Sequence, residues 1–277
     1  MTDHVEGRIA GVRGRTLYWQ GWTAPEPARG VVVVVHGLHE HGGRYAWAGQ
    51  QLAAAGFPAY AIDHAGHGRS DGVPGQIGRM SQVVDGVDAL VTEVGRRHPG
   101  VPRFMLGHSL GSLIALQYLT GNPQQMHGLI TSGCALVPTV VSPAERVLAK
   151  LLSAVLPGLP ITSLDSAQVS RDPAVVDYHR SNPLMVHSKI RARTGAEALA
   201  TVDALPAQLG RLRLPVLAVA GSADALADPA GSRLLVEKAG STDKTLIIYD
   251  GLYHEVLNEP EKQTVLDDIV TWLEKHR

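Results

Sequence analysis

The sequence predicts an α/β protein in which helices cover both faces of a mainly parallel sheet. Short apolar runs typical of buried strands alternate with longer stretches of helical periodicity along most of the chain. The run 31–35 consists of valine alone, as expected of a central strand covered on both faces. A second apolar run, 104–106, leads through Gly-x-Ser-x-Gly at 107–111 directly into a helical pattern.

The alternation of strand and helix is interrupted in the second half of the chain. After residue 136 helical patterns continue without a convincing strand, and strand patterns return only at Pro215. We therefore expect one core formed by residues 1–136 and 210–277, with an inserted helical cap over residues 137–209. A chain of 277 residues is long enough for one core with such an insertion.

The elements of the core follow in order from local patterns. The expected strands are an edge strand at 16–23 and then 31–35, 59–62, the strand that starts at 104 and carries Ser109, 129–131, 215–221 and 244–249. The expected helices are 45–55, 81–97, 110–119, 230–239 and 259–275. A turn is expected at 24–27, Ser81 is expected to cap the second helix, and Asn258 with Glu261 is expected to cap the last one.

Composition and charge exclude several classes of protein. The net charge of −1 gives no electrostatic basis for binding nucleic acid or an anionic surface. The single cysteine, Cys134, excludes an internal disulfide, fits a reducing compartment, and is expected to be a small buried group after a strand. The N-terminus lacks the pattern of a signal peptide, and no apolar stretch reaches the ~18 residues of a membrane span. We expect a cytoplasmic protein and leave membrane association through the cap open.

The Gly-x-Ser-x-Gly pattern predicts a nucleophile at Ser109. When a strand turns at once into a helix, the backbone is crowded on both sides of the turn, and only glycine fits at positions 107 and 111. This sharp turn is the nucleophile elbow of α/β-hydrolases. The N–H of Leu110 would then lie at a helix N-terminus, where it can stabilise an oxyanion.

A serine hydroxyl needs a histidine base, which a carboxylate usually orients. Ligands bind beyond the carboxyl ends of parallel strands, and Asp224 and His254 follow the last two expected strands. The order Ser109, Asp224, His254 is that of α/β-hydrolases. Asp228 is the rival acid, but it precedes Pro229 and a helix, so we expect it to cap that helix.

The loop after the valine strand is expected to supply the second oxyanion donor, the backbone N–H of Leu38. This loop and the one after the next strand contain many polar side chains, namely His36, His39, Glu40, His41, His64, His67, Arg69 and Asp71. Their spacing is that of a loop and matches no metal-site pattern, so we expect hydrogen-bonded loop residues with neither metal nor cofactor. We expect His108 to pack or hydrogen-bond beside the nucleophile rather than act as a second base.

Four separated segments resemble the monoacylglycerol lipase family of serine hydrolases. They are HGLHEHGGRY at 36–45, DHAGHGRSDG at 63–72, GHSLG at 107–111 and GLYHEVLNE at 251–259. Within the expected cap, 155–160 and 170–173 resemble the bacterial and mycobacterial branch. The resemblance implies an eight-stranded α/β-hydrolase fold, the Ser109–Asp224–His254 triad, an oxyanion hole formed by the N–H groups of Leu38 and Leu110, and release of a fatty acid and glycerol from a monoacylglycerol.

This chain departs from the family at two positions. The family often has methionine where Leu110 stands, and a backbone donor tolerates that change. It often has glycine where Ser112 stands, which bears on the packing behind the elbow.

The cap contains an apolar stripe at helical spacing, comprising Leu148, Leu151, Leu152, Val155 and Leu156. One interpretation is that the stripe packs the cap on the core. The other is that it lines an acyl tunnel or touches lipid, with Leu152, Val155 and Leu156 as substrate-binding residues. A homodimer through the cap, a lysophospholipase, a broad carboxylesterase and a non-catalytic binding protein remain alternatives.

Overall fold

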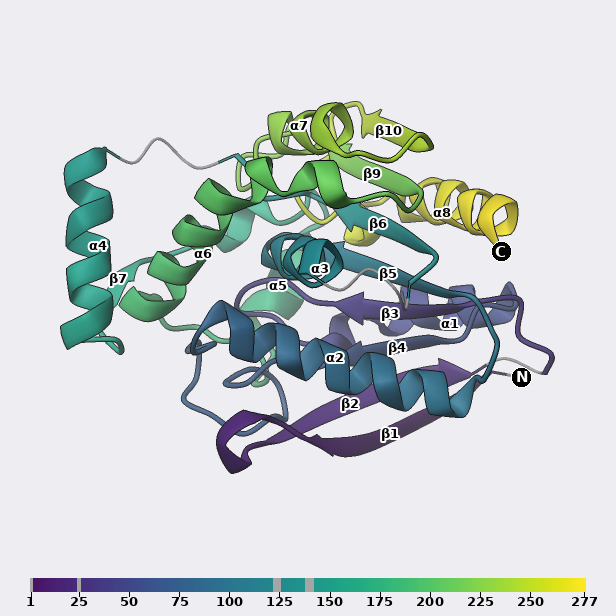
Figure 1. Ribbon diagram of the computed structural model, residues 1–277, viewed down its shortest axis with the longest axis horizontal. Helices are drawn as coiled ribbons and strands as arrows, with labels where there is room; N and C mark the ends of the chain where they lie inside the picture. Colours follow the sequence, from purple (N-terminus) through teal and green to yellow (C-terminus); the bar gives the residue numbers. More distant parts are fainter. Residues whose placement is uncertain (1, 24–25, 122–125, 138–141) are drawn as a thin grey trace.

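The computed structural model describes residues 2–23, 26–121, 126–137 and 142–277. Within these ranges one eight-stranded sheet has the order β1-β2-β4-β3-β5-β6-β9-β10 (Figure 1). β1 and β2 pair antiparallel, as do β2 and β4, and every other neighbouring pair is parallel. The strands are β1 Asp3–Ala10, β2 Thr16–Thr23, β3 Val31–Val35, β4 Ala59–Ile62, β5 Arg103–His108, β6 Gly128–Ser132, β9 Val216–Gly221 and β10 Lys244–Tyr249. The predicted α/β-hydrolase fold with eight strands is confirmed.

The sheet divides the hydrophobic core into two layers, one on each face. Val31, Val33 and Val35 of β3 belong to one layer, whereas Val32 and Val34 belong to the other. Successive side chains of a strand point to opposite faces, so an all-valine strand supplies both layers. All five valines are fully buried, as their composition predicts.

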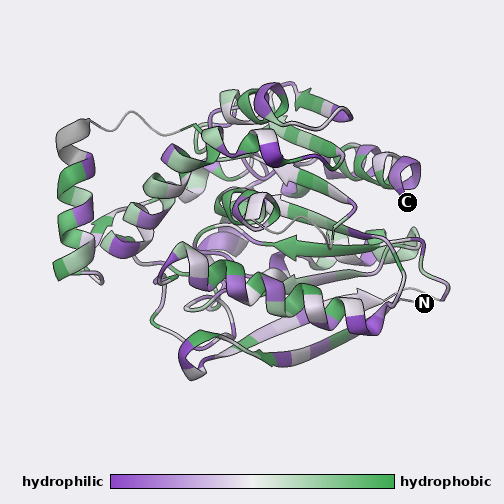
Figure 2. Cartoon of the chain, in the orientation of Figure 1, coloured by the Kyte–Doolittle hydropathy of each residue, from purple (hydrophilic) through white to green (hydrophobic). Residues whose placement is uncertain are grey.

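Helices cover both layers (Figure 1). Buried side chains of α2, α3 and α7 belong to one layer, and those of α1 and α8 to the other. Figure 2 shows the central strands in the hydrophobic colour, while much of the surface of α2 and α8 carries the hydrophilic one. The bounds are α1 Ala46–Ala54, α2 Met80–Arg97, α3 Leu110–Gly121, α7 Ala230–Lys238 and α8 Lys262–His276.

The first strand of the sheet was not expected from the sequence. β1 pairs with β2 along its whole length, from Asp3 opposite Thr23 to Ala10 opposite Thr16. The expectation that 16–23 forms the edge is therefore wrong, because β1 lies outside it. Polar and charged residues alternate along β1 with half-buried ones, so its apolar signal is weak. Ala24 and Pro25 of the expected turn lie outside the described residues.

Two predicted helix caps are also wrong. α2 begins at Met80, one residue before Ser81, and the Arg79 N–H donates to the Gln82 side chain at 3.1 Å. α8 begins at Lys262, and Asn258 instead donates to the Glu255 carboxylate at 2.9 Å. In both places a hydrogen bond between residues three apart replaces the cap that was expected.

The chain between β6 and β9 contributes three further helices among the described residues. These elements are α4 Pro143–Val155, β7 Pro160–Thr162, α5 Pro173–Ser181, β8 Ile190–Arg191 and α6 Ala192–Ala204. β7 and β8 pair antiparallel, so the expectation that this stretch contains no strand is wrong. α4 projects from the body of the molecule and packs on α6 (Figure 1).

The apolar stripe on α4 faces outward. Leu148, Leu151, Val155 and Leu156 are each more than half exposed, and Val155 is 76% exposed. The interpretation that this stripe packs the cap on the core is therefore wrong for these four side chains. Among the described residues, no helix combines the length and the hydropathy needed to cross a membrane.

Candidate active site

Ser109 lies at the sharp turn between β5 and α3, in a backbone conformation that side chains rarely adopt. Its φ is +52°. A Cβ at Gly111 would lie 2.0 Å from the Val35 carbonyl oxygen, and a Cβ at Gly107 would lie 2.6 Å from the Gly111 carbonyl oxygen. Both glycines are therefore required by close backbone approach, as the sequence predicts. A strained residue held this tightly is typical of a functional turn.

Ser112 stabilises the elbow from behind. Its hydroxyl donates to the Ser109 carbonyl at 2.5 Å, and the same hydroxyl accepts the Ala135 N–H at 3.3 Å. The side chain is fully buried. A serine at this position therefore fits the packing and adds a link to the loop after β6.

His254 and Asp224 form a buried pair at the carboxyl ends of β10 and β9. His254 Nδ1 lies 2.8 Å from one Asp224 oxygen, and the other oxygen accepts the N–H groups of Leu226 and Ala227 at 2.9 and 2.8 Å. These bonds fix the carboxylate so that it orients the imidazole. Asp228 instead accepts the N–H of Ala230 at 2.8 Å, the capping contact predicted for it.

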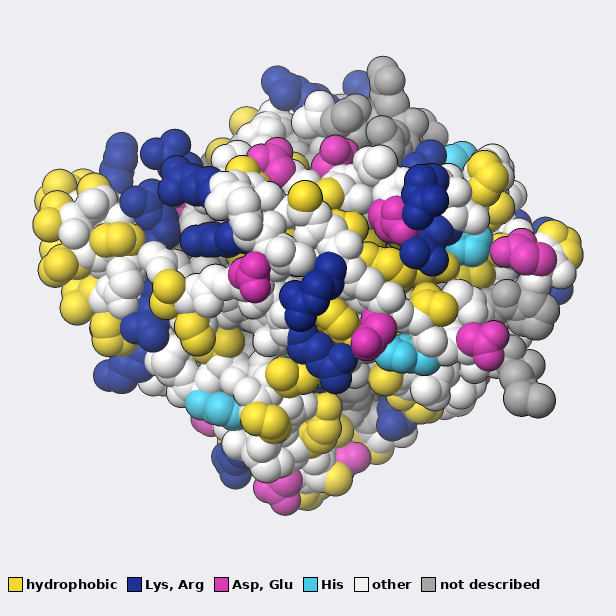
Figure 3. Space-filling model, turned by 90° about the horizontal axis from the view of Figure 1, so that it is seen from below, with side chains coloured by type: hydrophobic (Ala, Val, Ile, Leu, Met, Phe, Trp, Pro, Cys, Tyr) yellow, Lys and Arg dark blue, Asp and Glu magenta, His cyan; other side chains and the backbone are white. Residues whose placement is uncertain are grey.

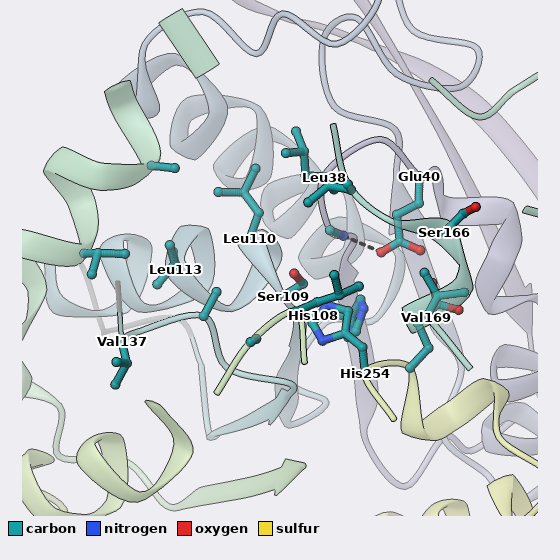
Figure 4. A pocket seen from close by; sticks show the side chains of 18 of the residues that line it. Leu38, Glu40, His108, Ser109, Leu110, Leu113, Val137, Ser166, Val169 and His254 are labelled. Atoms are coloured by element: carbon teal, nitrogen blue, oxygen red, sulfur yellow. Dashed lines mark hydrogen bonds between the residues drawn. The ribbon is translucent and has the colours of Figure 1, made fainter. Parts of the chain in front are cut away.

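Ser109 and His254 lie on the wall of one cavity of about 200 Å³ (Figure 4). Leu113 and Val137 lie on one side of Ser109 in Figure 4, and Glu40 and Ser166 lie on the other. The lining also includes the apolar side chains of Ala198, Leu199 and Val202 and the polar side chains of His179 and Glu255. No hydrogen bond joins Ser109 to His254 among the described residues. In unliganded sites such bonds often tighten only when substrate binds.

Leu38 and Leu110, the two expected oxyanion donors, both line this cavity beside Ser109 (Figure 4). Leu110 is the first residue of α3, so its N–H has no partner inside the helix. The loop that carries Leu38 is fixed at the preceding residue, because the Gly37 N–H donates to Glu40 Oε1 at 2.5 Å. Both expected donors are thus part of the same cavity wall as Ser109.

A buried ionic network supports the loop that carries Leu38. Glu40 also accepts the Tyr45 hydroxyl at 2.9 Å, and Arg44 forms a bidentate pair with Glu255. Burial raises the pKa of the Glu40 carboxyl, with Arg44 opposing it. Burial also acts to raise the pKa of Glu255, but Arg44 outweighs it and holds that pKa below its ordinary value. The network ties the loop after β3 to the loop of His254.

The histidines of the two loops form a buried cluster, which the sequence analysis did not predict. His36 Nε2 accepts the His64 N–H at 2.9 Å, and the His36 and His64 ring centroids are 4.1 Å apart. The centroid of the His67 ring lies 5.5 Å from that of His36 and 6.4 Å from that of His39. Burial lowers the pKa of His64 to about 3 and those of His39 and His67 to about 4. No metal-binding group of three or more side chains occurs in the described ranges.

His108 and Cys134 lie close to the nucleophile, but neither suits its chemistry. Burial, followed by the neighbouring His254, lowers the pKa of His108 to about 3, so it is a poor base near neutral pH. Its Nδ1 lies 3.0 Å from the Ser132 carbonyl. Burial raises the pKa of Cys134 to about 11, which keeps the thiol protonated. Both side chains have the structural roles expected for them.

The predicted substrate-binding residues do not line this cavity. They are Leu152 and Val155 of α4 and Leu156, which directly follows it. His179 of α5 and Glu255 do line it and were not singled out from the sequence. Glu255 directly follows His254, which is a usable signal, whereas no periodicity or spacing directs attention to His179.

The elbow, the buried His–Asp pair and the α/β sheet define a serine hydrolase of the α/β-hydrolase fold. The family model described as serine aminopeptidase, S33, matches residues 26–261. The monoacylglycerol lipase of Mycolicibacterium smegmatis is 40% identical over 272 residues, covering 98% of this chain and 97% of that one. The chain therefore belongs to the monoacylglycerol lipase family, as the resemblance of its motifs implies.

Two further relatives agree. The monoglyceride lipase of Homo sapiens is 33% identical over 264 residues, covering 94% of this chain and 87% of that one. The crystal structure of Paleococcus ferrophilus monoacylglycerol lipase matches with a TM-score of 0.85 and 34% identity, covering 94% of this chain and 99% of that one.

Proposed function

We propose that the protein hydrolyses monoacylglycerols to glycerol and a free fatty acid, with Ser109 as nucleophile, His254 as base and Asp224 as the orienting acid. The observation that carries the proposal is the placement of Ser109 and the Asp224-bound His254 on one cavity wall, between an apolar end and a polar end. The apolar end suits an acyl chain and the polar end suits glycerol. The names of the relatives support the same substrate class.

The reaction proceeds in two acyl transfers. His254 takes the Ser109 proton as Ser109 Oγ attacks the ester carbonyl carbon. The tetrahedral intermediate collapses, its bond to the glycerol oxygen breaks, and His254 gives the proton to that oxygen. Water then attacks the acyl-enzyme while His254 accepts a proton from it. The bond to Ser109 breaks, the proton returns to Ser109, and the fatty acid leaves.

The N–H groups of Leu38 and Leu110 stabilise the negative oxygen in both tetrahedral intermediates. Loss of one such donor typically costs about 10²–10³ in kcat. Glu40 acts on this step indirectly, because it holds the Gly37 N–H and thereby the turn that presents Leu38.

The test compares fatty-acid release from a monoacylglycerol, a diacylglycerol, a triacylglycerol, a lysophospholipid and a short soluble ester, with Ser109→Ala as the blank. We expect release chiefly from the monoacylglycerol and none from the blank. Release chiefly from the lysophospholipid or the short ester would still support the serine mechanism but would contradict the proposed monoacylglycerol substrate. Labelling of the wild type by a fluorophosphonate, absent in Ser109→Ala, would exclude a non-catalytic binding protein.

We also propose that residues 137–209 act as a cap over a core of residues 1–136 and 210–277, and that α4 contacts a lipid surface. Figure 3 displays hydrophobic side chains gathered at the end of the molecule that α4 forms, with Lys and Arg side chains nearby. From residue 178 to 196 the cap carries Arg180, Lys189, Arg191 and Arg193 and no acidic residue. This charge supports attraction to anionic lipid, although the whole chain is nearly neutral.

Vesicle flotation tests the lipid contact. Val155→Ser with Leu156→Ser should reduce binding to vesicles of mixed zwitterionic and anionic lipid, because their exposed side chains would enter the membrane. Val73→Ser is the matched control, since Val73 is 50% exposed outside the cap. Unchanged flotation of the double variant, together with loss of a dimer in gel filtration, would favour a homodimer through α4 instead. A cytoplasmic location is proposed with this, supported by the lack of a cysteine pair.

A further inference from the structure

A groove of about 580 Å³ lies between α4 and α6. From α4 it is lined by residues three or four positions apart, which share one face of the helix, namely Arg146, Ala149, Lys150, Ser153 and Ala154. The exposed apolar side chains of Leu148, Leu151 and Val155 follow the same spacing on another face. The charged face of α4 therefore lines the groove, while its apolar face meets solvent.

Positive charge exceeds negative charge in this groove. The charged side chains that line it are Arg79, Arg146, Lys150 and Arg193 on one hand, and Glu197 and Asp203 on the other. Asp203 pairs with Arg146, and Glu197 lies 3.5 Å from Arg193. Neither Arg79 nor Lys150 has an ion pair among the described residues, so two positive charges in the groove are left uncompensated.

The two uncompensated cations come from different parts of the fold. Arg79 immediately precedes α2, which covers one face of the sheet, whereas Lys150 lies on α4. Both side chains are exposed, and both are long enough to turn their charged ends toward an ion in the groove. Like charges repel each other, and an anion placed between them is attracted by both. The groove is therefore suited to an anionic group.

α4 is attached to the molecule in a different way from α5. The chain just before α5 is fastened to the loop that holds His254, because the Glu255 N–H donates to the Val169 carbonyl at 2.8 Å and Arg171 pairs with Glu259 at 2.9 Å. α4 instead packs chiefly on α6. An anion held by the two uncompensated cations would add a link between α4 and the start of α2.

We propose that this groove binds the phosphate of an anionic phospholipid while the apolar face of α4 contacts the membrane. The inference rests on the proposed lipid contact of α4 and adds a site for one headgroup beside it. Apolar side chains and Lys and Arg side chains lie next to each other at this end of the molecule (Figure 3). An amphipathic helix lies at the boundary of headgroups and acyl chains, so the charged face of α4 is at the level of the phosphates. Arg79 and Lys150 then donate charge-assisted hydrogen bonds to phosphate oxygens.

Vesicle flotation measures the preference for anionic lipid as the ratio of two binding constants, one for vesicles that contain phosphatidylglycerol and one for vesicles of phosphatidylcholine alone. A cation near an anionic surface contributes about fivefold to binding. We expect Arg79→Gln with Lys150→Gln to lower the preference by about tenfold or more and to leave binding to phosphatidylcholine unchanged. Arg180→Gln with Lys189→Gln is the matched control, because it removes one exposed Arg and one exposed Lys of the same stretch outside the groove. This control should lower the preference by about threefold at most.

Equal losses in the two double variants would overturn the inference, because they would indicate diffuse attraction without a site. Release from anionic vesicles by inorganic phosphate, at an ionic strength where chloride has no effect, would mean that the groove takes the free ion and would overturn the assignment to a lipid. A wild type that binds both kinds of vesicle equally would overturn the inference alone. A wild type that binds neither would overturn the proposed lipid contact as well. Hydrolysis of a short soluble ester shows that each variant is folded, since the triad lies outside the groove.

Discussion

We expect acid to lower the stability of the folded protein, because the buried histidines of the cluster must bind protons when the chain unfolds. His67 is the histidine on which this can be tested. Its side chain is 2% exposed, its Nδ1 lies 3.1 Å from the Ala65 carbonyl, and its Nε2 is buried without a partner. Burial lowers the pKa of His67 from 6.5 to about 4. The folded state therefore keeps His67 neutral at pH values where the unfolded chain binds a proton.

The sign and size of the effect follow from that difference in pKa. The contribution of His67 to stability is fully present above pH 6.5 and is lost progressively as the pH falls toward 4. Between pH 7 and pH 5 the loss is about 2 kcal/mol for this one group. The other buried histidines of the cluster act in the same direction.

Urea unfolding of the wild type and of His67→Gln between pH 8 and pH 5 measures the pH-dependent contribution of His67 to the free energy of unfolding. The variant differs from the wild type in absolute stability, and that offset at pH 8 is the baseline. We expect the free energy of unfolding of the variant to fall by about 2 kcal/mol less than that of the wild type between pH 7 and pH 5. Parallel pH dependences would refute the reasoning, because they would mean that His67 binds protons equally in both states.

Three further predictions concern the elbow and the triad. Gly111→Ala should destabilise the fold by about 3 kcal/mol, measured by urea unfolding, because its Cβ meets backbone at 2.0 Å, whereas Gly158→Ala, with nothing within 4 Å, should cost under ~1 kcal/mol. Ser112→Ala should cost about 1–2 kcal/mol in the same assay, since it removes partners from two backbone groups. Asp224→Asn should lower kcat for ester hydrolysis by about 10⁴ while Asp228→Asn retains it, and equal losses would contradict the choice of acid.

Most of the core was predictable because its signals are local. The valine strand, the two glycines of the elbow and the order of Ser109, Asp224 and His254 can all be identified without knowing what packs against them. The first strand was not predictable in this way, because β1 owes its place to pairing with β2.

Two further features could not be predicted because they depend on long-range contacts. They are the residues at the polar end of the cavity and the exposure of α4. A helical stripe has the same pattern whether it faces a core or solvent, so Leu151 and Val155 could not be assigned to either from periodicity. His179 lines the cavity only because the fold places α5 beside it.

The anchors of α5 have a mechanical consequence. The loop that carries His254 also holds Glu255 and Glu259, which fasten α5 through Val169 and Arg171. If α5 swung outward to admit substrate, it would pull on the backbone that positions the catalytic base. A displacement of α5 would therefore be transmitted to the loop of His254, whereas α4 packs chiefly on α6.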